Sequence, residues 1–327
     1  MQSNSNFDQS RWRGVSKLVA AAVFLASCGA MRVEAQQAGQ KTFRSAQAAS
    51  AALVDAAKDN DEQAMLAILG PDAKRIVSSG DETEDAASRS TFVQRYTQMH
   101  RLVKEPNGTT TLYVGAENWP MPIPLVEKAG TWYFDTAAGQ REILYRRIGR
   151  NEMSTMRVCK ELVAAQKEYY SSHNGEYAQK IFSDEGKQDG LYWKTGAGQL
   201  ESPIGPLVAA AVSEDYALRP QGATATPYRG YLYHALVRQG ANAKGGAKNY
   251  VVGGRMTGGF AFVAYPAEYR SSGVMTFIVN GDGTVYEKDL GPNTAAIAKA
   301  MKTFNPDSTW KNDDVPEEQP ATEQPSK

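Results

Sequence analysis

Apolar positions in the middle of the chain repeat with the period of a helix. Between about Asn151 and Tyr170 they form two adjacent stripes at steps of three, four and seven residues. The stripes consist of Val158, Leu162, Ala165 and Tyr169, and of Met156, Cys159, Val163 and Tyr170. A broad apolar face of this kind is typical of a helix that buries one side. We therefore expect one long amphipathic helix here.

After this helix, short apolar runs predict strands. Residues 260–265 and 274–279 are apolar on both faces, which is typical of strands in the interior of a covered sheet. Residues 280–283 (NGDG) predict a hairpin turn into a strand at residues 285–288. Residues 231–237 predict a further strand. The second half of the chain therefore reads as a long helix on an antiparallel sheet.

The first half predicts helices followed by strands. Ser45 can cap a helix that ends near Lys58, and Gly70 and Pro71 end a second helix. A third helix is expected around Phe92. The expected strands are residues 110–114, the proline-rich edge segment 119–126, and residues 131–135. This order predicts a separate N-terminal α+β domain.

The N-terminus has the pattern of an export signal. Arg11, Arg13 and Lys17 precede an apolar run at residues 18–26 that is too short to span a bilayer. Two processing sites are compatible with this run. Cleavage before Cys28, in a lipobox-like Leu-Ala-Ser-Cys, would leave that cysteine as a lipid-modified N-terminus. Ordinary signal peptidase would instead cleave after Ala35.

These patterns divide the 327 residues into five segments, and this length is enough for two cores. The expected segments are a signal peptide at 1–35 (1–27 in a lipoprotein), a linker at 36–41, an N-terminal α+β domain at 42–148, a second α+β domain at 149–303, and a disordered tail rich in Pro, Glu and Gln at 304–327.

Composition removes several classes of function. Lys+Arg and Asp+Glu both number 36, so no net charge favours binding to nucleic acid. The histidines (His100, His173 and His234) make no i, i+4 pair, and neither cysteine lies close to them in the sequence. We therefore expect no metal site and no cofactor. Two cysteines also provide no disulfide framework.

Several long sequence segments resemble those of a known family. They are residues 67–73 (AILGPDA), 77–81 (VSSGD), 118–126 (NWPMPIPLV), 132–152 (WYFDTAAGQREILYRRIGRNE) and 277–291 (FIVNGDGTVYEKDLG). Over about residues 42–303 the chain resembles the bacterial domain-of-unknown-function 2950 family. The resemblance implies an exported bacterial protein, and it supplies no catalytic or binding residues.

Two fold analogies follow from the order of elements. Helices before a sheet that ends in Trp132-Tyr133-Phe134-Asp135 are similar to the cone-shaped nuclear-transport-factor-two-like fold. A long helix on an antiparallel meander resembles the globular part of type IV pilins. The helix here lacks the apolar N-terminal half of a pilin, so this resemblance concerns shape alone.

One weak constellation of chemical groups lies in the first domain. His100 and Asp135, with Tyr113, would form an acid/base pair if they converged inside a cone-shaped cavity. The competing interpretation is that Asp135 caps a turn and His100 ends a helix. Both interpretations fit the sequence.

A second constellation is the aromatic set of the second domain: Trp193, Tyr228, Arg229, Tyr231 and Tyr233. Tyrosines and tryptophans with polar groups suit sugar or peptide ligands. They equally suit a sheet packed beneath a helix.

The sequence therefore predicts an exported envelope protein, either periplasmic or lipid-anchored through Cys28. The favoured function is a non-catalytic binding or structural module whose partner is an envelope protein or glycan. The alternatives are a small-substrate hydrolase or isomerase that uses a cavity of the first domain, and a glycan or peptide recogniser that uses the second domain.

The export hypothesis predicts the mass of the mature protein. Protein recovered from its host should lack the leader and begin either with lipid-modified Cys28 or with unmodified Gln36. Intact-mass spectrometry distinguishes the two, since acyl chains add mass to the longer form. Recovery of the unprocessed 35.6 kDa chain would contradict export.

Overall fold

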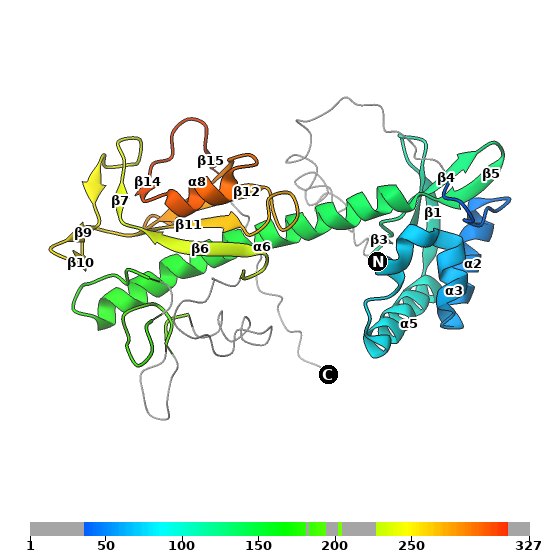
Figure 1. Ribbon diagram of the computed structural model, residues 1–327, viewed down its shortest axis with the longest axis horizontal. Helices are drawn as coiled ribbons and strands as arrows, with labels where there is room; N and C mark the ends of the chain where they lie inside the picture. The colour runs from blue at the N-terminus through cyan, green and yellow to red at the C-terminus, as the bar shows by residue number, and fades with distance from the viewer. Residues whose placement is uncertain (1–35, 181–182, 194–201, 205–226, 313–327) are drawn as a thin grey trace, which may run out of the picture. The chain divides into compact units, whose positions relative to one another are not determined.

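The computed structural model describes residues 36–180, 183–193, 202–204 and 227–312 (Figure 1). The predicted leader, Cys28, both processing sites and the tail beyond residue 312 lie outside the described residues. The chain divides into two compact units, residues 1–146 (unit 1) and 147–327 (unit 2). Both units combine helices with antiparallel sheets, so the predicted α+β class is confirmed.

The helices of unit 1 include the three predicted ones and two short additional turns. The predicted helices are α2 (Ala46–Lys58), α3 (Glu62–Leu69) and α5 (Glu82–Gln98), and the additional turns are the 3₁₀ turn η1 (Pro71–Ala73) and α4 (Lys74–Val77). The Ser45 hydroxyl accepts a hydrogen bond from the Ala48 amide and caps α2, as predicted. Gly70 ends α3 with φ of 92°, a value that a residue with a side chain rarely adopts.

The sheet of unit 1 follows these helices. Its strands are β1 (His100–Lys104), β2 (Thr110–Val114), β3 (Trp119–Pro120), β4 (Leu125–Lys128) and β5 (Thr131–Phe134). They pair in the order β1-β2-β4-β5, and the proline-containing β3 pairs only with β2. The apolar faces of α2 and α3 pack with Ile123, Leu125 and Phe134 to form the core of this unit.

The long helix is longer than predicted. Helix α6 runs over Thr136–Ser172, whereas the apolar periodicity placed its start near Asn151. The missed turns carry many charges and two glycines, Gly139 and Gly149, yet they contain no proline, and Glu142 pairs with Arg146 one turn away at 2.7 Å. Each glycine costs a helix only about 1 kcal/mol. The division between the two units therefore falls inside α6.

The main sheet of unit 2 has five antiparallel strands. They are β6 (Tyr231–Leu236), β11 (Ala261–Pro266), β12 (Met275–Asn280), β13 (Val285–Asp289) and β15 (Lys311–Asn312). They pair in the order β15-β13-β12-β11-β6. The predicted hairpin joins β12 to β13, with the Gly283 amide donating to the Asn280 carbonyl at 3.0 Å.

Smaller elements complete unit 2. They are β7 (Arg238–Gln239), β8 (Lys248–Asn249), β9 (Val251–Val252), β10 (Arg255–Met256), α8 (Thr294–Ala300) and β14 (Thr303–Phe304). Strands β14, β7 and β8 form a three-stranded sheet, and β9 pairs with β10.

Helices α6 and α8 cover opposite faces of the main sheet (Figure 1). On one face, the Tyr233 hydroxyl meets the Thr155 hydroxyl of α6 at 3.3 Å. On the other face, His234 Nε2 lies 3.0 Å from the carbonyl of Met301, the residue after α8. Because β11 and β12 are interior strands covered on both sides, almost every residue in them is buried. The prediction that both are central strands is confirmed.

The polar segment after Thr303 is structured as far as residue 312. Phe304 is 1% exposed and its ring meets that of Tyr286 at 6.0 Å. Strand β15 extends the main sheet by pairing with β13. The expectation of disorder from residue 304 is therefore wrong for residues 304–312. Their Asn, Pro and Asp residues are typical of turns as well as of disordered tails.

One carboxylate fixes α6 against β12. Glu152 Oε1 accepts hydrogen bonds from the amides of Val274 at 2.8 Å and Met275 at 3.0 Å, and lies 3.5 Å from the Tyr231 hydroxyl. The backbone at Gly273 passes very close to that hydroxyl, since a Cβ on Gly273 would lie 2.1 Å from it. The two amide bonds to Glu152 fix the position of α6 along the sheet.

Replacing this carboxylate should destabilise unit 2. We expect Glu152→Ala to lower the free energy of unfolding by about 2–3 kcal/mol, because two backbone amides lose a charged acceptor. Urea denaturation followed through the transition of unit 2 measures the change. The control is Glu142→Ala, which breaks a partly exposed i, i+4 pair in the unit 1 part of the same helix and should cost at most about 0.5 kcal/mol. Equal losses in the two variants would contradict this role of Glu152.

Candidate functional site

The structure does not bring the predicted acid/base pair together. His100 begins β1 at one edge of the unit 1 sheet, and Asp135 follows β5 at the other edge. Two strands separate them, which corresponds to roughly 14 Å at the usual strand spacing. The His100 ring is exposed and stacks on Tyr96 at 3.8 Å. The Tyr113 hydroxyl donates to Glu105.

Asp135 has a structural task. It is 6% exposed, and its Oδ1 accepts a hydrogen bond from the Ala138 amide at 2.9 Å, which caps the start of α6. It also lines a hollow of about 350 Å³ together with Gln37, Gln40 and Asp72. The buried Gln40 amide donates to the carbonyls of Ile68, Leu69 and Phe134. These polar side chains hold neighbouring segments of unit 1 together.

The predicted aromatic surface of unit 2 consists largely of core residues. Tyr231 is fully buried and donates to the Met275 carbonyl at 3.0 Å, and Trp193 is 5% exposed. Burial raises the pKa of both Tyr231 and Tyr233 well above the usual value. The Arg229 guanidinium lies 5.8 Å from the centre of the Tyr228 ring. The five residues therefore form no common ligand surface, because Tyr231 and Trp193 are buried in the core while Arg229 is an exposed turn residue.

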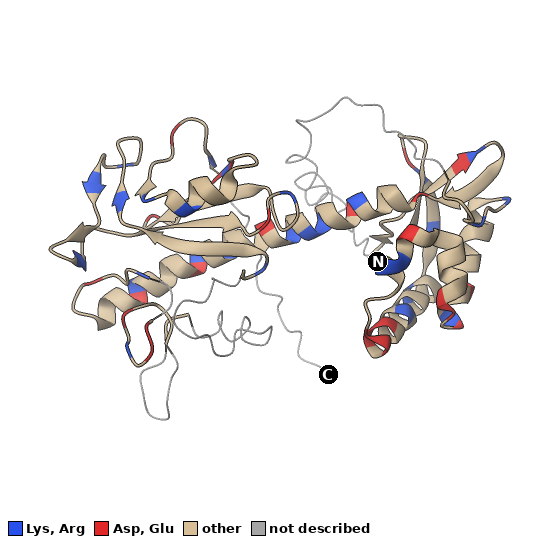
Figure 2. Ribbon diagram, viewed as in Figure 1, with Lys and Arg blue, Asp and Glu red and all other residues tan. Residues whose placement is uncertain are grey.

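Other reactive groups lie apart from one another. Cys159 is a fully buried residue of α6, and burial raises the pKa of its thiol to about 12. Within the described ranges, no group of three or more His, Cys, Asp or Glu residues is arranged to hold a metal ion. In that same part of the chain, no helix has the length and apolar character needed to cross a bilayer. Figure 2 shows both signs of charge on each unit, with acidic residues at the start of α5.

A cavity that the sequence did not reveal lies at the C-terminal end of α6. It has a volume of about 310 Å³ and lies within unit 2. Nine residues line it: Tyr169, Ser172, His173, Asn174, Glu176, Tyr177, Ala178, Gln179 and Asp189. We call it the α6-end cavity.

Aromatic rings form one part of this cavity. His173 stacks on Tyr169, one helical turn earlier, with 3.7 Å between ring centres, and its Nδ1 lies 3.1 Å from the Tyr169 carbonyl. The edge of His173 faces Trp193 at 6.1 Å. Tyr177 contacts the rings of Tyr170 and Phe260 and remains half-buried. The rings are therefore held in place by one another.

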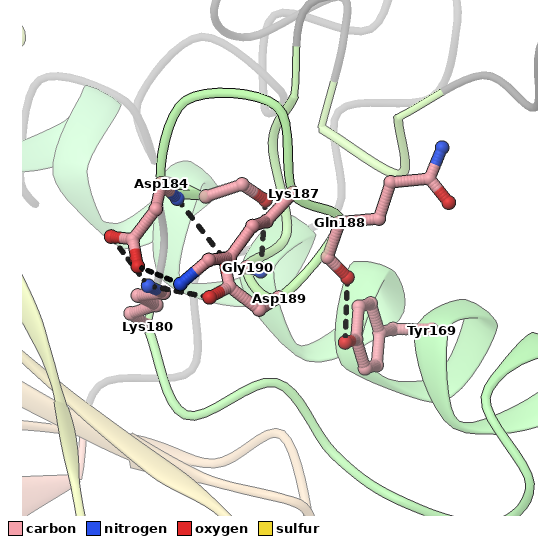
Figure 3. A network of polar contacts seen from close by, with 8 residues as sticks. Tyr169, Lys180, Asp184, Lys187, Gln188, Asp189 and Gly190 are labelled. Carbon is pink, nitrogen blue, oxygen red and sulfur yellow. Dashed lines mark hydrogen bonds and ion pairs between the residues drawn. The ribbon is translucent and has the colours of Figure 1, made fainter.

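The loop that contains residues 183–190 supplies a second part of the cavity wall, through Asp189 (Figure 3). Lys180 Nζ bridges Asp184 at 2.7 Å and Asp189 at 2.8 Å, and Lys187 pairs with Asp184. The hydrogen bond from Lys180 holds the pKa of Asp184 below its usual range. Each exposed pair contributes little to stability, but a bridging lysine restricts the shape of the loop. The Tyr169 hydroxyl adds a bond of 3.0 Å to the Gln188 carbonyl.

The third part is residues 176–179, which are anchored on both sides. Glu176 pairs with Arg255 at 2.6 Å, and Gln179 Nε2 donates to the Gly254 carbonyl, so the segment is held to the β9–β10 hairpin. From α6, the buried Gln166 amide donates to the Ala178 carbonyl at 2.7 Å and accepts from the Ala178 amide at 2.8 Å. The walls therefore have a defined geometry without any ligand.

One local signal could have pointed to this cavity. Tyr169 and His173 are four residues apart at the end of the predicted helix, and Asn174-Gly175 follows as a turn. This spacing places the two rings on one helical face. The remaining lining residues come from irregular segments, where no periodicity indicates the contacts.

Comparisons with known proteins identify a family and no individual relative. The model of a family described as a protein of unknown function (DUF2950) matches residues 40–312. Neither the curated proteins nor the solved structures contain a significant match.

The capping role of Asp135 predicts how two substitutions differ. Asp135→Asn should leave the stability of unit 1 within about 0.5 kcal/mol of the wild type, because asparagine caps helices as well as aspartate. Asp135→Ala should cost about 1 kcal/mol. Urea denaturation measures both. As a control, Asp72→Ala changes an exposed acid at the same hollow and should have little effect. A catalytic activity that Asp135→Asn abolishes would contradict a purely structural role.

Proposed function

This chain belongs to the DUF2950 family, whose function is unknown, and we propose that it acts as a non-catalytic binding module of the cell envelope. We place the binding site in the α6-end cavity of unit 2. The observation that carries the proposal is that the walls of this cavity are held in place independently of any ligand. Its three parts are braced by stacked rings, bridging ion pairs and the paired amide of Gln166.

Such preorganisation favours binding. A site whose side chains are already ordered loses less conformational entropy when a ligand enters. The volume of about 310 Å³ lies at the lower end of the range for small-molecule sites and suits a single side chain or sugar unit. The lining combines rings with a few polar groups, which is typical of such sites.

The non-catalytic part of the proposal is supported by the roles of the reactive groups. Asp135 caps α6, and the buried Cys159 thiol has a raised pKa that suppresses the thiolate. His100 lies at the opposite edge of its sheet from Asp135. The alternative of a small-substrate hydrolase or isomerase in unit 1 therefore has no converging acid and base to support it.

The proposed localisation in the cell envelope is supported by the sequence alone. The basic residues before the apolar run at 18–26 favour export, and Cys28 favours a lipid anchor. The partners that fit this localisation are an envelope protein or a glycan.

A matched pair of variants tests the proposal. Ser172 lines the cavity and Ser171 does not, although both are exposed in the last turn of α6. We expect the wild type and Ser171→Trp, cross-linked in intact envelopes, to retain the same partner protein or glycan fragment by mass spectrometry. Ser172→Trp should lose it, because the indole occupies the cavity. Retention by Ser172→Trp, or no retained partner in any form, would refute the proposal.

A further inference from the structure

We propose that the α6-end cavity selects a positively charged group, namely the ammonium or guanidinium of a small ligand or of a protruding side chain. This inference rests on the proposed function and adds the chemical class of the ligand. Three independent features of the cavity favour a cation.

The first feature is the charge of the lining. Two of its nine residues, Glu176 and Asp189, are acidic, and none of the nine is a lysine or arginine. Both carboxylates belong to half-buried residues, where Coulomb interactions are stronger than in bulk water. An anionic ligand would have to approach both of them.

The second feature is the end of the helix. Ser172 is the last residue of α6, and it lines the cavity with the two residues that follow it. The C-terminus of a helix carries roughly half a negative charge, and that charge is concentrated on the carbonyls of the last turn. A cation near Ser172 therefore gains from the same field that would repel an anion.

The third feature is the set of rings. Tyr169, His173 and Tyr177 line the cavity, and the face of a tyrosine ring attracts cations. Because His173 stacks on one face of Tyr169, which is 6% exposed, Tyr177 offers the more accessible ring. Contacts between a cation and a ring strengthen as water is removed, and Tyr177 is already half-buried. Neutral sugars also stack on rings, but the two carboxylates and the helix end give an additional advantage to a charged ligand.

The carboxylates of Glu176 and Asp189 already have cationic partners, so a ligand can bind only if they can accept further hydrogen bonds. Arg255 contacts Oε1 of Glu176. Lys180 contacts Oδ2 of Asp189, and the Asp184 amide donates to Oδ1 of Asp189. Neither cation is among the lining residues. A carboxylate accepts up to about four hydrogen bonds, so a ligand can bind without displacing either partner. The side chains of both pairs remain 33–56% exposed to solvent, so rearranging the pairs would cost little.

The experiment is a titration of the purified full chain with matched small probes, followed by amide chemical shifts in NMR. The charged probes are Nα-acetyl-lysine amide and glucosamine, which represent a peptide side chain and an amino sugar. Their uncharged counterparts are Nα-acetyl-norleucine amide and glucose. We expect saturable shifts at residues 172–179 with at least one charged probe, and at least about fivefold weaker binding of its neutral counterpart.

Variants locate the effect. Glu176→Gln and Asp189→Asn should each weaken binding of the charged probe by about tenfold, because each removes a charged acceptor. Glu142→Gln, which neutralises a partly exposed acid in unit 1, should leave the binding of the charged probe unchanged. Together the two cavity acids also hold Arg255, Lys180 and the Asp184 amide, so the melting temperature of each variant is measured to show that it is folded. Having two variants guards against misfolding of either one.

The outcomes separate this inference from the proposed function. Equal binding of charged and neutral probes, binding unaffected by both acid variants, or no binding of any charged probe would each overturn the selection for a cation. If Ser172→Trp still loses the envelope partner in such a case, the binding function stands and only the ligand class is wrong. If Ser172→Trp also retains that partner, both proposals fail.

Discussion

The docking of α6 on the main sheet of unit 2 is the interaction on which the rest of that unit depends. Its apolar stripe places Cys159 and Leu162 in the same core as Phe262 and Phe277. Hydrophobic burial is not directional, so it does not by itself fix how far α6 lies along the sheet. Polar contacts supply that register. Glu152 binds the first amides of the β12 segment, and Gln166 pairs with the backbone of Ala178 four turns later. The burial therefore provides most of the stability, and these two side chains provide the position.

The α6-end cavity follows from that position. Gln166 holds the segment that carries Glu176 and Tyr177, while Tyr169 holds the loop that carries Asp189. The same helix turn supplies the His173 ring and the negative end of the helix dipole. One element thus orders the walls of the cavity and contributes to its electrostatic character. In unit 1, by contrast, Asp135 and Gln40 are engaged in joining segments of the fold.

The differences between sequence and structure have specific physical causes. The start of α6 was missed because residues 136–150 carry charges around much of the helix, which weakens the apolar periodicity there. The intrinsic helix propensity of these residues is nevertheless adequate. The strand β15 was missed because a two-residue edge strand has no pattern of its own and forms only when β13 is beside it. His100 and Asp135 could not be separated by sequence reasoning because the distance between them depends on strand order, which loop lengths leave open.

The sequence by itself determined what local periodicity and turn chemistry encode. This includes the buried face of α6, the central strands β11 and β12, the Asn280–Gly283 hairpin, the Ser45 cap and the α+β class. Only the tertiary structure decided which side chains meet at the α6-end cavity. Its walls depend on contacts such as Gln179 with Gly254 and Glu176 with Arg255, which join residues more than 70 positions apart through irregular segments. Such contacts leave no periodic trace in the sequence, because each depends on where a separate element has packed.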